Sequence, residues 1–468
     1  IEDDPEWFRY HQLFAEFLRH RLGRDDPERS QRLHRTAAAW FAQHGYLNEA
    51  VNHALAADDA TLAVDLVEHD YARLLEASKM TTLLEIAKKL PPPLVASRAR
   101  LQLASAWANI LLQRRAPADA ALNRFEAALG SAELADESRT DLRVEADVLR
   151  GVADLFADRS DRIDSLVAEA FSRPDTFHPR VPGVAGIIAA FAAIYRFEFD
   201  DARRLLRWAA PYQDMMGPFA SVYAHCFGGI AAKYELDIAT ARREFCEAFE
   251  LGCKAGSRSH AARLAGALLG ELLYEAGELD EATRLLEMSY GLGSEGGGVD
   301  YLAARYVGSA KVKAAQGDLG AAAELLDAGM TAAEQLQLPR LVAAINNERI
   351  RSGIGVRPAV ATRLQSAQTI PRDDGIATII AELDEDSAVR LLLVSGSAQE
   401  QDEACRRASE LLAGIDAARR PLAGLRAQLL LAETLVRIGR SADPAIPAVA
   451  RRCQEIGLPR FAVDAGLG

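Results

Sequence analysis

Several features that narrow protein function are scarce in this sequence, cysteine first among them. There are five cysteines in 468 residues, at positions 226, 246, 253, 405 and 453, and no two form a Cys-x-x-Cys pair. An odd number at irregular spacing argues against a disulfide framework and against a zinc site built from paired cysteines. We expect the thiols to be reduced and packed between helices.

Signals for membrane insertion and export are lacking too. The longest uncharged apolar stretch, residues 183–195, has thirteen residues, whereas roughly 20 are needed to cross a bilayer. No cationic start is followed by an apolar core, which disfavours secretion. We therefore expect a cytoplasmic protein with no membrane partner. Because the sequence opens at Ile1 without an initiator methionine, we also expect a fragment of a longer protein.

Basic residues are also relatively few. The 54 Lys and Arg residues are outnumbered by 67 Asp and Glu, for a net charge of −13, and no basic block is interleaved with aromatic residues. This excludes the electrostatic footprint of a nucleic-acid-binding protein and favours a basic partner or an uncharged ligand. Hydrophobic residues still make up 49% of the chain, which is enough for a large folded core.

What the sequence does contain is a repeated phrase, a short polar turn followed by an alanine-rich helix. Its four clearest copies start 39, 41 and 40 residues apart, at residues 197–202 (FEFDDA), 236–241 (LDIATA), 277–282 (GELDEA) and 317–322 (GDLGAA). A period of this length fits one helix pair per repeat. We predict an all-α fold, a tetratricopeptide-like helix-pair solenoid wound as a right-handed superhelix.

The clarity of the pattern divides the chain. Residues 25–180 are expected to form irregular N-terminal helical repeats, residues 181–355 regular tetratricopeptide-like repeats, and residues 356–468 C-terminal helical repeats with an exit segment. The proline-containing stretch 174–183 is the expected border between the first two. Whether residues 353–375 form a flexible break or an irregular repeat stays open.

Two local motifs invite a catalytic interpretation, and both are better explained by packing. The run 291–298 contains a formal Gly-x-Gly-x-x-Gly, but a helix precedes it instead of the strand that a dinucleotide site requires. His225 and Cys226 are adjacent, so on a helix they point about 100° apart, and no orienting partner is identifiable. We predict neither catalytic residues nor a metal site, hence no enzyme.

The ligand surface is the sharper prediction. In helical solenoids the first helix of each pair usually lines the concave face. Besides the candidates named below, those helices carry Lys233, Tyr306, Lys311 and Asn347 as further aromatic and polar residues for such a groove. The competing interpretation is that the tyrosines pack between repeats and the charges are solvated. The candidate ligand-binding residues are Tyr223, Glu271, Tyr274, Tyr301, Arg305 and Asn346.

Segments near the start of the chain resemble one known family. Residues 7–19 (WFRYHQLFAEFLR), 33–41 (LHRTAAAWF) and 44–54 (HGYLNEAVNHA) together resemble the MalT-like large ATP-binding regulators of the LuxR family. Residues 457–466 are similar to the segment that precedes the linker to the DNA-binding domain in that family. The match is specific at the N-terminal end and weaker further on.

The resemblance implies a role. Such regulators combine a nucleotide-binding module, a winged-helix element, a helical sensor and a C-terminal helix-turn-helix. This sequence has no Gly-x-x-x-x-Gly-Lys-[Ser/Thr] loop and no helix-turn-helix after Gly468. The resemblance thus implies the sensor domain, with residues 1–24 as the end of the winged-helix module. ATP and DNA would be bound by other modules, so no cofactor and no nucleic acid are expected here.

We therefore predict an inducer-sensing domain of an ATP-dependent transcriptional activator. A small polar metabolite would be held in the groove by stacking on tyrosine and by hydrogen bonds from Arg, Glu and Asn, and would control self-association. The alternative is a docking scaffold for an extended peptide or a partner subunit. A third possibility is an oligomerisation arm that assembles without a ligand.

Overall fold

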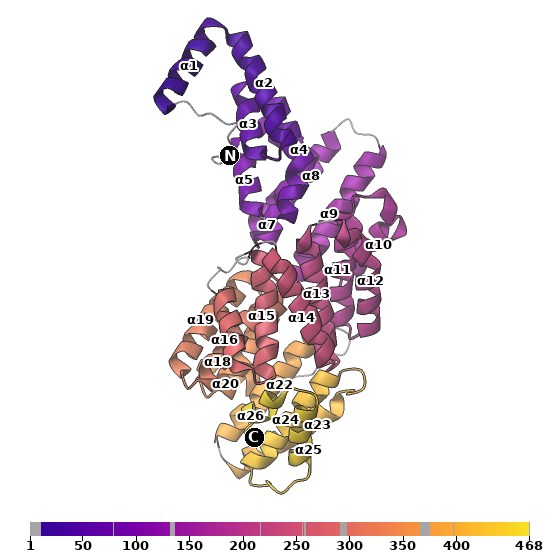
Figure 1. Ribbon diagram of the computed structural model, residues 1–468. Coiled ribbons are helices and arrows are strands. Elements are labelled where there is room, and N and C mark those ends of the chain that lie inside the picture. Colours follow the sequence, from indigo (N-terminus) through magenta and orange to yellow (C-terminus); the bar gives the residue numbers. More distant parts are fainter. Residues whose placement is uncertain are drawn as a thin grey trace. The chain divides into compact units, whose positions relative to one another are not determined.

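The computed structural model describes residues 11–77, 79–131, 136–215, 217–254, 256, 259–290, 297–365, 375–395 and 397–467. The described residues form helices joined by turns, with no strand among them (Figure 1). Successive helices pack in adjacent pairs, so the predicted all-α helical solenoid is confirmed. Within the described ranges, every helix is too short or too polar to traverse a lipid bilayer.

The chain forms two compact units. The first unit consists of Ile1–Leu75, Lys79–Ile110 and Arg114–Leu142, and the second consists of Glu76–Ser78, Leu111–Gln113 and Arg143–Gly468. The predicted border near residue 180 thus falls inside the second unit. The helices of the first unit are α1 (Gln12–Asp25), α2 (Pro27–Gln43), α3 (Leu47–Ala56), α4 (Ala60–Glu76), α5 (Met80–Lys89), α6 (Pro92–Ser97), α7 (Ala99–Leu111) and α8 (Arg115–Ser131).

The second unit begins within α9 (Asp136–Phe156) and continues through the regular repeats. These are α10 (Ile163–Ser172), a 3₁₀ turn (Pro174–Thr176), α11 (Arg180–Tyr195), α12 (Phe199–Asp214), α13 (Pro218–Tyr234), α14 (Ile238–Lys254), α15 (His260–Glu275), α16 (Leu279–Tyr290), α17 (Val299–Ala303), a π-helical turn (Ala304–Gly308), α18 (Ser309–Ala315), α19 (Leu319–Leu336) and α20 (Pro339–Arg351).

The unit ends with α21 (Pro358–Gln365), α22 (Gly375–Ser395), α23 (Ala398–Gly414), α24 (Pro421–Arg437), α25 (Ala445–Glu455) and α26 (Pro459–Asp464). Part of the undecided region 353–375 is therefore helical, while residues 366–374 lie outside the described residues. So do residues 291–296, which contain most of the glycine-rich motif.

The repeated phrase has one structural meaning, the helix-ending turn. Its first residue adopts the left-handed backbone conformation, with φ of 61° at Phe197, 63° at Leu236, 87° at Gly277 and 85° at Gly317. The next N–H then bonds the carbonyl five residues back, the pattern of a Schellman motif. These bonds run from Glu198 to Ala193, Asp237 to Ala232, Glu278 to Leu273 and Asp318 to Lys313.

The alanine of the phrase is the point where the two helices of a pair touch. Ala202, Ala241, Ala282 and Ala322 are buried, and so are three of the bulky residues four positions later, Phe245, Leu286 and Leu326. A methyl side chain allows close helix approach, and the larger residue fills the space one turn further on. The predicted spacing of small and large core residues is confirmed at these positions.

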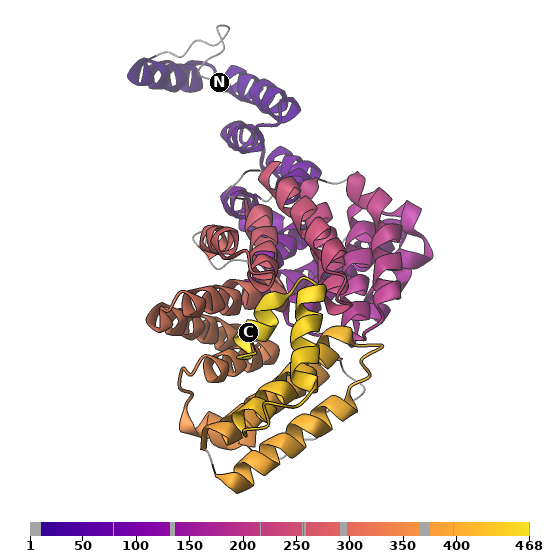
Figure 2. The same ribbon diagram turned by 60° about the horizontal axis from the view of Figure 1, so that its bottom comes forward.

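The C-terminal helices return to the earlier repeats of the second unit. Helix α22 packs on α20, α24 packs on α13, and α26 packs on α15. Figure 2 shows α24 and α26, coloured yellow, beside the orange and magenta helices of the repeats. Segments far apart in the sequence therefore face one another across the interior of the unit.

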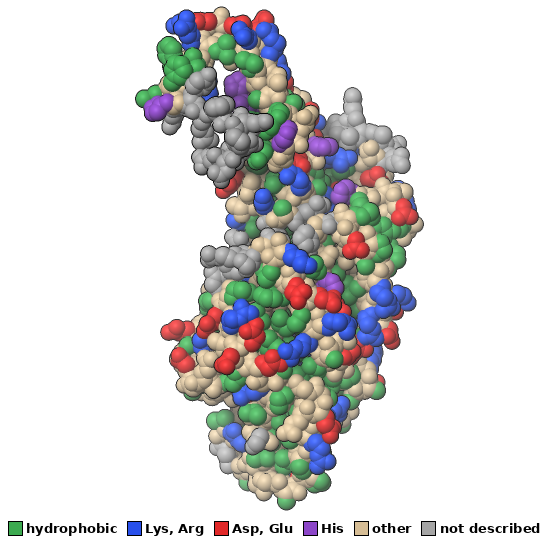
Figure 3. Space-filling model, in the orientation of Figure 1, with side chains coloured by type: hydrophobic (Ala, Val, Ile, Leu, Met, Phe, Trp, Pro, Cys, Tyr) green, Lys and Arg blue, Asp and Glu red, His purple; other side chains and the backbone are tan. Residues whose placement is uncertain are grey.

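Charged residues on the surface are mixed in sign. On the face in Figure 3, basic and acidic side chains alternate over the second unit. Typical exposed pairs are Arg284 with Glu281 and Arg406 with Glu410, the latter at 2.6 Å. Exposed pairs of this kind contribute about 0–1 kcal/mol each, so they add little to the stability of the fold.

Candidate functional site: a charged cavity in the second unit

The second unit contains a cavity of about 280 Å³, and its lining comes both from the first helices of the repeat pairs and from the C-terminal helices. Helices α13, α15, α17, α18 and α20 supply one part of the wall, and α22, α24 and α26 supply the part that folds back on them. A volume just below the usual range for ligand sites suits a small molecule better than a folded partner.

The wall formed by α17 and α18 contains the π-helical turn. Val299, Ala303, Val307 and Lys311 line the cavity at spacings of four residues. In an α-helix, residues four apart drift by about 40° around the axis. The wider turn at Ala304–Gly308 reduces that drift, which helps to bring Lys311 to the same side as Ala303.

A buried arginine holds one end of the cavity together. Arg340 on α20 bonds both carboxylate oxygens of Asp158, at 2.8 and 2.6 Å, and Asp300 at 3.0 Å. Its guanidinium also donates to the hydroxyl of Tyr195 at 2.7 Å and lies over that ring, 4.3 Å from the centroid. Burial alone would raise the pKa of Asp300, but Arg340 outweighs it and the pKa is lowered.

A second buried cation joins α13 to α15. The ammonium of Lys233 lies 2.9 Å from Glu271 and 2.8 Å from Glu275. Burial would lower the pKa of Lys233, yet the two carboxylates raise it above its ordinary value. The group therefore stays charged, and the triad fixes the relative position of two neighbouring repeats.

The C-terminal helices carry further ion pairs into the cavity. On α22, Glu382 pairs with Arg420 at 2.6 Å, and Asp386 pairs with Arg390 at 2.6 Å. Arg390 also reaches Glu433 on α24. These side chains are largely buried, so each pair must remain matched to avoid leaving an isolated charge.

The last helix, α26, is attached to the wall by a polar cluster. The hydroxyl of Tyr274 on α15 donates to both oxygens of Asp464, at 3.0 and 2.9 Å. Arg460 bonds Asp464 at 2.6 Å, and Arg351 lies 3.7 Å from it. Because Asp464 and Phe461 line the cavity, the C-terminal helix forms part of the site.

Two cations in the lining differ from the others. Lys311 on α18 and Arg426 on α24 make no ion pair with the described residues, whereas each other Lys or Arg of the lining has a carboxylate partner. Burial tends to raise the pKa of Glu271, but Lys233, Lys311 and Arg426 together lower it. Lys311 and Arg426 therefore both act on the carboxylate of Glu271, and Lys311 acts also on that of Glu348.

The structure separates the six predicted ligand-binding residues. Glu271 lines the cavity, and Tyr274 lies behind the lining residue Asp464. Tyr223, Tyr301, Arg305 and Asn346 are buried and do not belong to the lining. Arg305, for example, donates to the carbonyl of Tyr290 at 3.2 Å. Of the other first-helix residues considered, Lys233, Lys311 and Asn347 do line the cavity.

Sequence reasoning missed the contribution of the C-terminal helices. Glu382, Asp386, Arg390, Arg420 and Arg426 lie where the repeat pattern is weak. A usable signal was present in α22, because Asp386 and Arg390 are four residues apart, the spacing of an ion pair along one helix.

Comparison with known proteins supports one part of the predicted resemblance. Residues 1–30 match the MalT winged helix domain. Over 170 residues, 36% of this chain, the sequence is 32% identical to the HTH-type transcriptional regulator MalT of Serratia proteamaculans, covering 19% of that protein. A 171-residue match to MalT of Yersinia pestis is 31% identical. The chain is thus MalT-like in part of its length.

A different protein is similar over the full chain. The sequence is 62% identical over all 468 residues to the serine/threonine-protein kinase PknK of Mycobacterium tuberculosis and to that of Mycobacterium bovis. The resemblance to MalT-like regulators did not anticipate a kinase. The chain spans 42% of the length of these PknK proteins, and part of its sequence is also similar to MalT.

Proposed function

We propose that this chain is a ligand-sensing helical module and that the cavity of the second unit binds a small polar molecule with a negatively charged group. The observation that carries the proposal is the presence of Lys311 and Arg426 in the lining without ion-pair partners among the described residues. A carboxylate or phosphate of the ligand would complete their coordination by charge-assisted hydrogen bonds.

The remaining charges set the size and charge of that ligand. The paired cations, such as Arg340 and Arg390, are held by buried carboxylates and are not available to bind it. Carboxylates such as Glu271 can accept hydrogen bonds from hydroxyl or amino groups of the ligand. A compact polar metabolite with a single negative charge fits this arrangement better than a polyanion, and better than the uncharged ligand suggested by the net charge of the whole chain.

The binding test is a titration of the chain against small carboxylates and phosphomonoesters, by thermal shift and then calorimetry. Loss of one charge-assisted hydrogen bond costs about 1.5–3 kcal/mol, so Lys311→Ala and Arg426→Ala should each weaken binding about 10- to 100-fold. Arg437→Ala is the matched control, because Arg437 is an exposed arginine on the same helix and lies outside the lining. Equal affinity in all three variants would reject the assignment.

The same titration separates the docking-scaffold alternative. If no small anion changes the melting temperature, while an extended peptide binds and Arg426→Ala does not affect it, the module is a peptide-binding scaffold. Light scattering with and without the ligand tests whether binding controls self-association. Assembly that is independent of ligand would favour the oligomerisation arm.

We further propose that the output of the module is the regulation of a protein kinase. The 62% identity to PknK over the whole chain favours this longer protein over a MalT-type activator. Helix α26 contributes Asp464 to the lining, so a bound ligand would act directly on the position of that helix. Autophosphorylation of the full-length protein should change on addition of the ligand, and Arg426→Ala should remove that response.

A further inference from the structure

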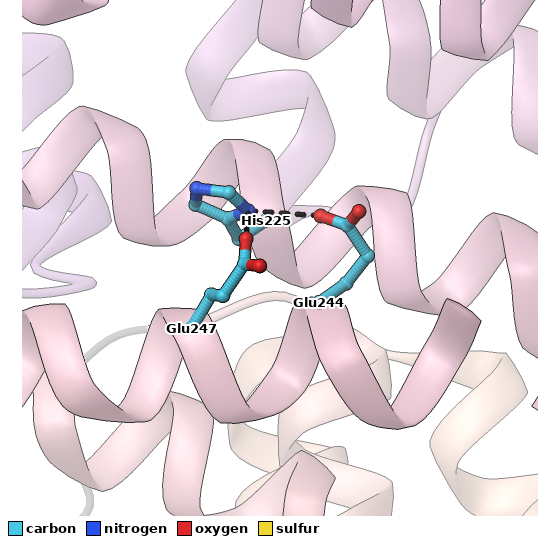
Figure 4. Close-up of side chains that lie close together, drawn as sticks. All are labelled: His225, Glu244 and Glu247. Atoms are coloured by element: carbon cyan, nitrogen blue, oxygen red, sulfur yellow. Dashed lines mark hydrogen bonds and ion pairs between the residues drawn. The ribbon is translucent and has the colours of Figure 1, made fainter. Parts of the chain in front are cut away.

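A second group of side chains lies outside the cavity lining, between α13 and α14. His225 on α13 directs its Nδ1 atom at two carboxylates of α14, with 2.8 Å to Oε2 of Glu244 and 3.4 Å to Oε2 of Glu247 (Figure 4). The two glutamates are three residues apart and share one face of their helix. All three side chains are half-buried or exposed, so ions in solution can reach them.

The spacing of these atoms is that of a metal coordination shell. One donor atom from each residue lies within 4.8 Å of the other two. Ligands bound at about 2.0–2.2 Å from a Zn²⁺ or Mn²⁺ ion are separated from one another by roughly 3.0–3.5 Å. The observed 2.8 and 3.4 Å already approach those separations, so an ion could enter with small side-chain rotations and no movement of the helices.

The neighbouring arginine does not occupy the oxygens that face the histidine. Arg243 bonds Oε1 of Glu244 at 3.2 Å and leaves Oε2 directed at His225. Arg243 is also four residues before Glu247, a spacing at which many arginines of this protein pair along their own helix. Glu247 instead points across to α13. Glu244 and Glu247 are therefore both oriented towards the imidazole.

We propose that His225, Glu244 and Glu247 form a binding site for a divalent transition-metal ion of the Zn²⁺ or Mn²⁺ type. One imidazole nitrogen and two carboxylate oxygens are donors that suit these ions, and three protein ligands leave open positions for water. The ion would join the two helices of one repeat. Helix α13 also carries Lys233, eight residues after His225, so the metal would stiffen a wall of the ligand cavity.

The experiment uses the whole chain, freed of metal with a chelator and then titrated with ZnCl₂ by calorimetry. Cobalt(II) added to the same protein gives a visible absorption spectrum that reports the donor set. The expected result is one ion bound per chain and a rise in melting temperature. Glu247→Gln and His225→Ala should each lower the affinity at least about 10-fold, and they should remove the cobalt spectrum.

Glu250→Gln is the matched control, because Glu250 is exposed on the same helix, three residues beyond Glu247, and it should bind metal like the unmodified chain. Glu247 is largely exposed, so its substitution is expected to leave the fold intact, which circular dichroism can verify. Two results would overturn the proposal: no stoichiometric binding by the unmodified chain, or an affinity that is the same in Glu247→Gln. The second result would mean that zinc binds other histidines.

Discussion

Replacement of Arg340 by leucine is the most direct test of how the cavity is stabilised. The side chain of Arg340 is 6% exposed and those of its partners Asp158 and Asp300 are 2% and 17% exposed. Removing one member of a buried ion pair typically costs 3–5 kcal/mol, since it leaves an uncompensated charge. We expect Arg340→Leu to lower the free energy of unfolding of the second unit by about 3–5 kcal/mol.

The cost should depend on pH in a defined direction. In the unmodified protein the pKa of Asp300 is lowered, so its contribution is complete above the ordinary carboxyl pKa and is lost only as the pH falls through the lowered value. Without the guanidinium, the two carboxylates repel each other and favour protonation. The variant should therefore recover part of the lost stability between pH 8 and pH 5, and the difference between the two proteins should shrink.

The measurement is differential scanning calorimetry at pH 8 and pH 5, with transitions assigned to each unit. Arg284→Leu provides the control, because Arg284 pairs with Glu281 on the surface, where both side chains are about half exposed, and its loss should cost about 0–1 kcal/mol. Asp300→Asn in the Arg340→Leu background should restore stability. If Arg340→Leu costs no more than Arg284→Leu, or costs the same at both pH values, the assigned role of the buried pair is wrong.

Three further predictions concern other parts of the chain. Gly317 adopts a left-handed backbone conformation with φ of 85°, and there is open space around it. Gly317→Ala should therefore lower the free energy of unfolding, measured with denaturant, by about 1–2 kcal/mol because of backbone strain alone. The control Gly320→Ala lies inside α19 and should be neutral or stabilising. Burial and the neighbouring His34 lower the pKa of His53 in the folded protein. His53 therefore takes up a proton when the first unit unfolds at low pH. The first unit should lose stability as the pH falls below about 6.5, by at most about 1.4 kcal/mol per pH unit. His53→Gln should flatten that dependence in thermal melts, and an unchanged slope would contradict it. Tyr274→Phe removes the hydroxyl that donates to the carboxylate of Asp464 on α26. The loss should destabilise the docking of α26 by about 1.5–3 kcal/mol and speed hydrogen exchange in residues 459–467. Unaltered exchange there would show that the cluster does not hold the helix.

The repeat itself could be predicted because its causes are local. The left-handed residue that starts each phrase, as at Gly277, and the buried alanine five positions later, as at Ala282, act within one helix pair. Hydrogen bonds over five residues and packing between adjacent helices leave a periodic trace in the sequence. The non-glycine residues at the same position, Phe197 and Leu236, show that the turn recurs even where its usual residue is replaced.

The membership of the cavity could not be predicted in the same way. The first helices of the pairs supply part of the lining, but among the six chosen residues only Glu271 reaches it. The tyrosines of those helices, such as Tyr223 and Tyr301, are buried between repeats. A helix that is covered on nearly all sides has no polar face from which the exposed direction can be read.

The sequence by itself determined that paired helices stack at a period near 40 residues and that part of the chain is MalT-like. Only the tertiary structure decided that α22, α24 and α26 return to complete the site. It also decided that Tyr274 bonds Asp464, 190 residues away in the sequence, and that Lys311 and Arg426 line the same cavity. The physical reason is that the curvature of a solenoid is the sum of many small rotations between neighbouring helices. Local interactions set each rotation, while the contacts between distant repeats depend on their total.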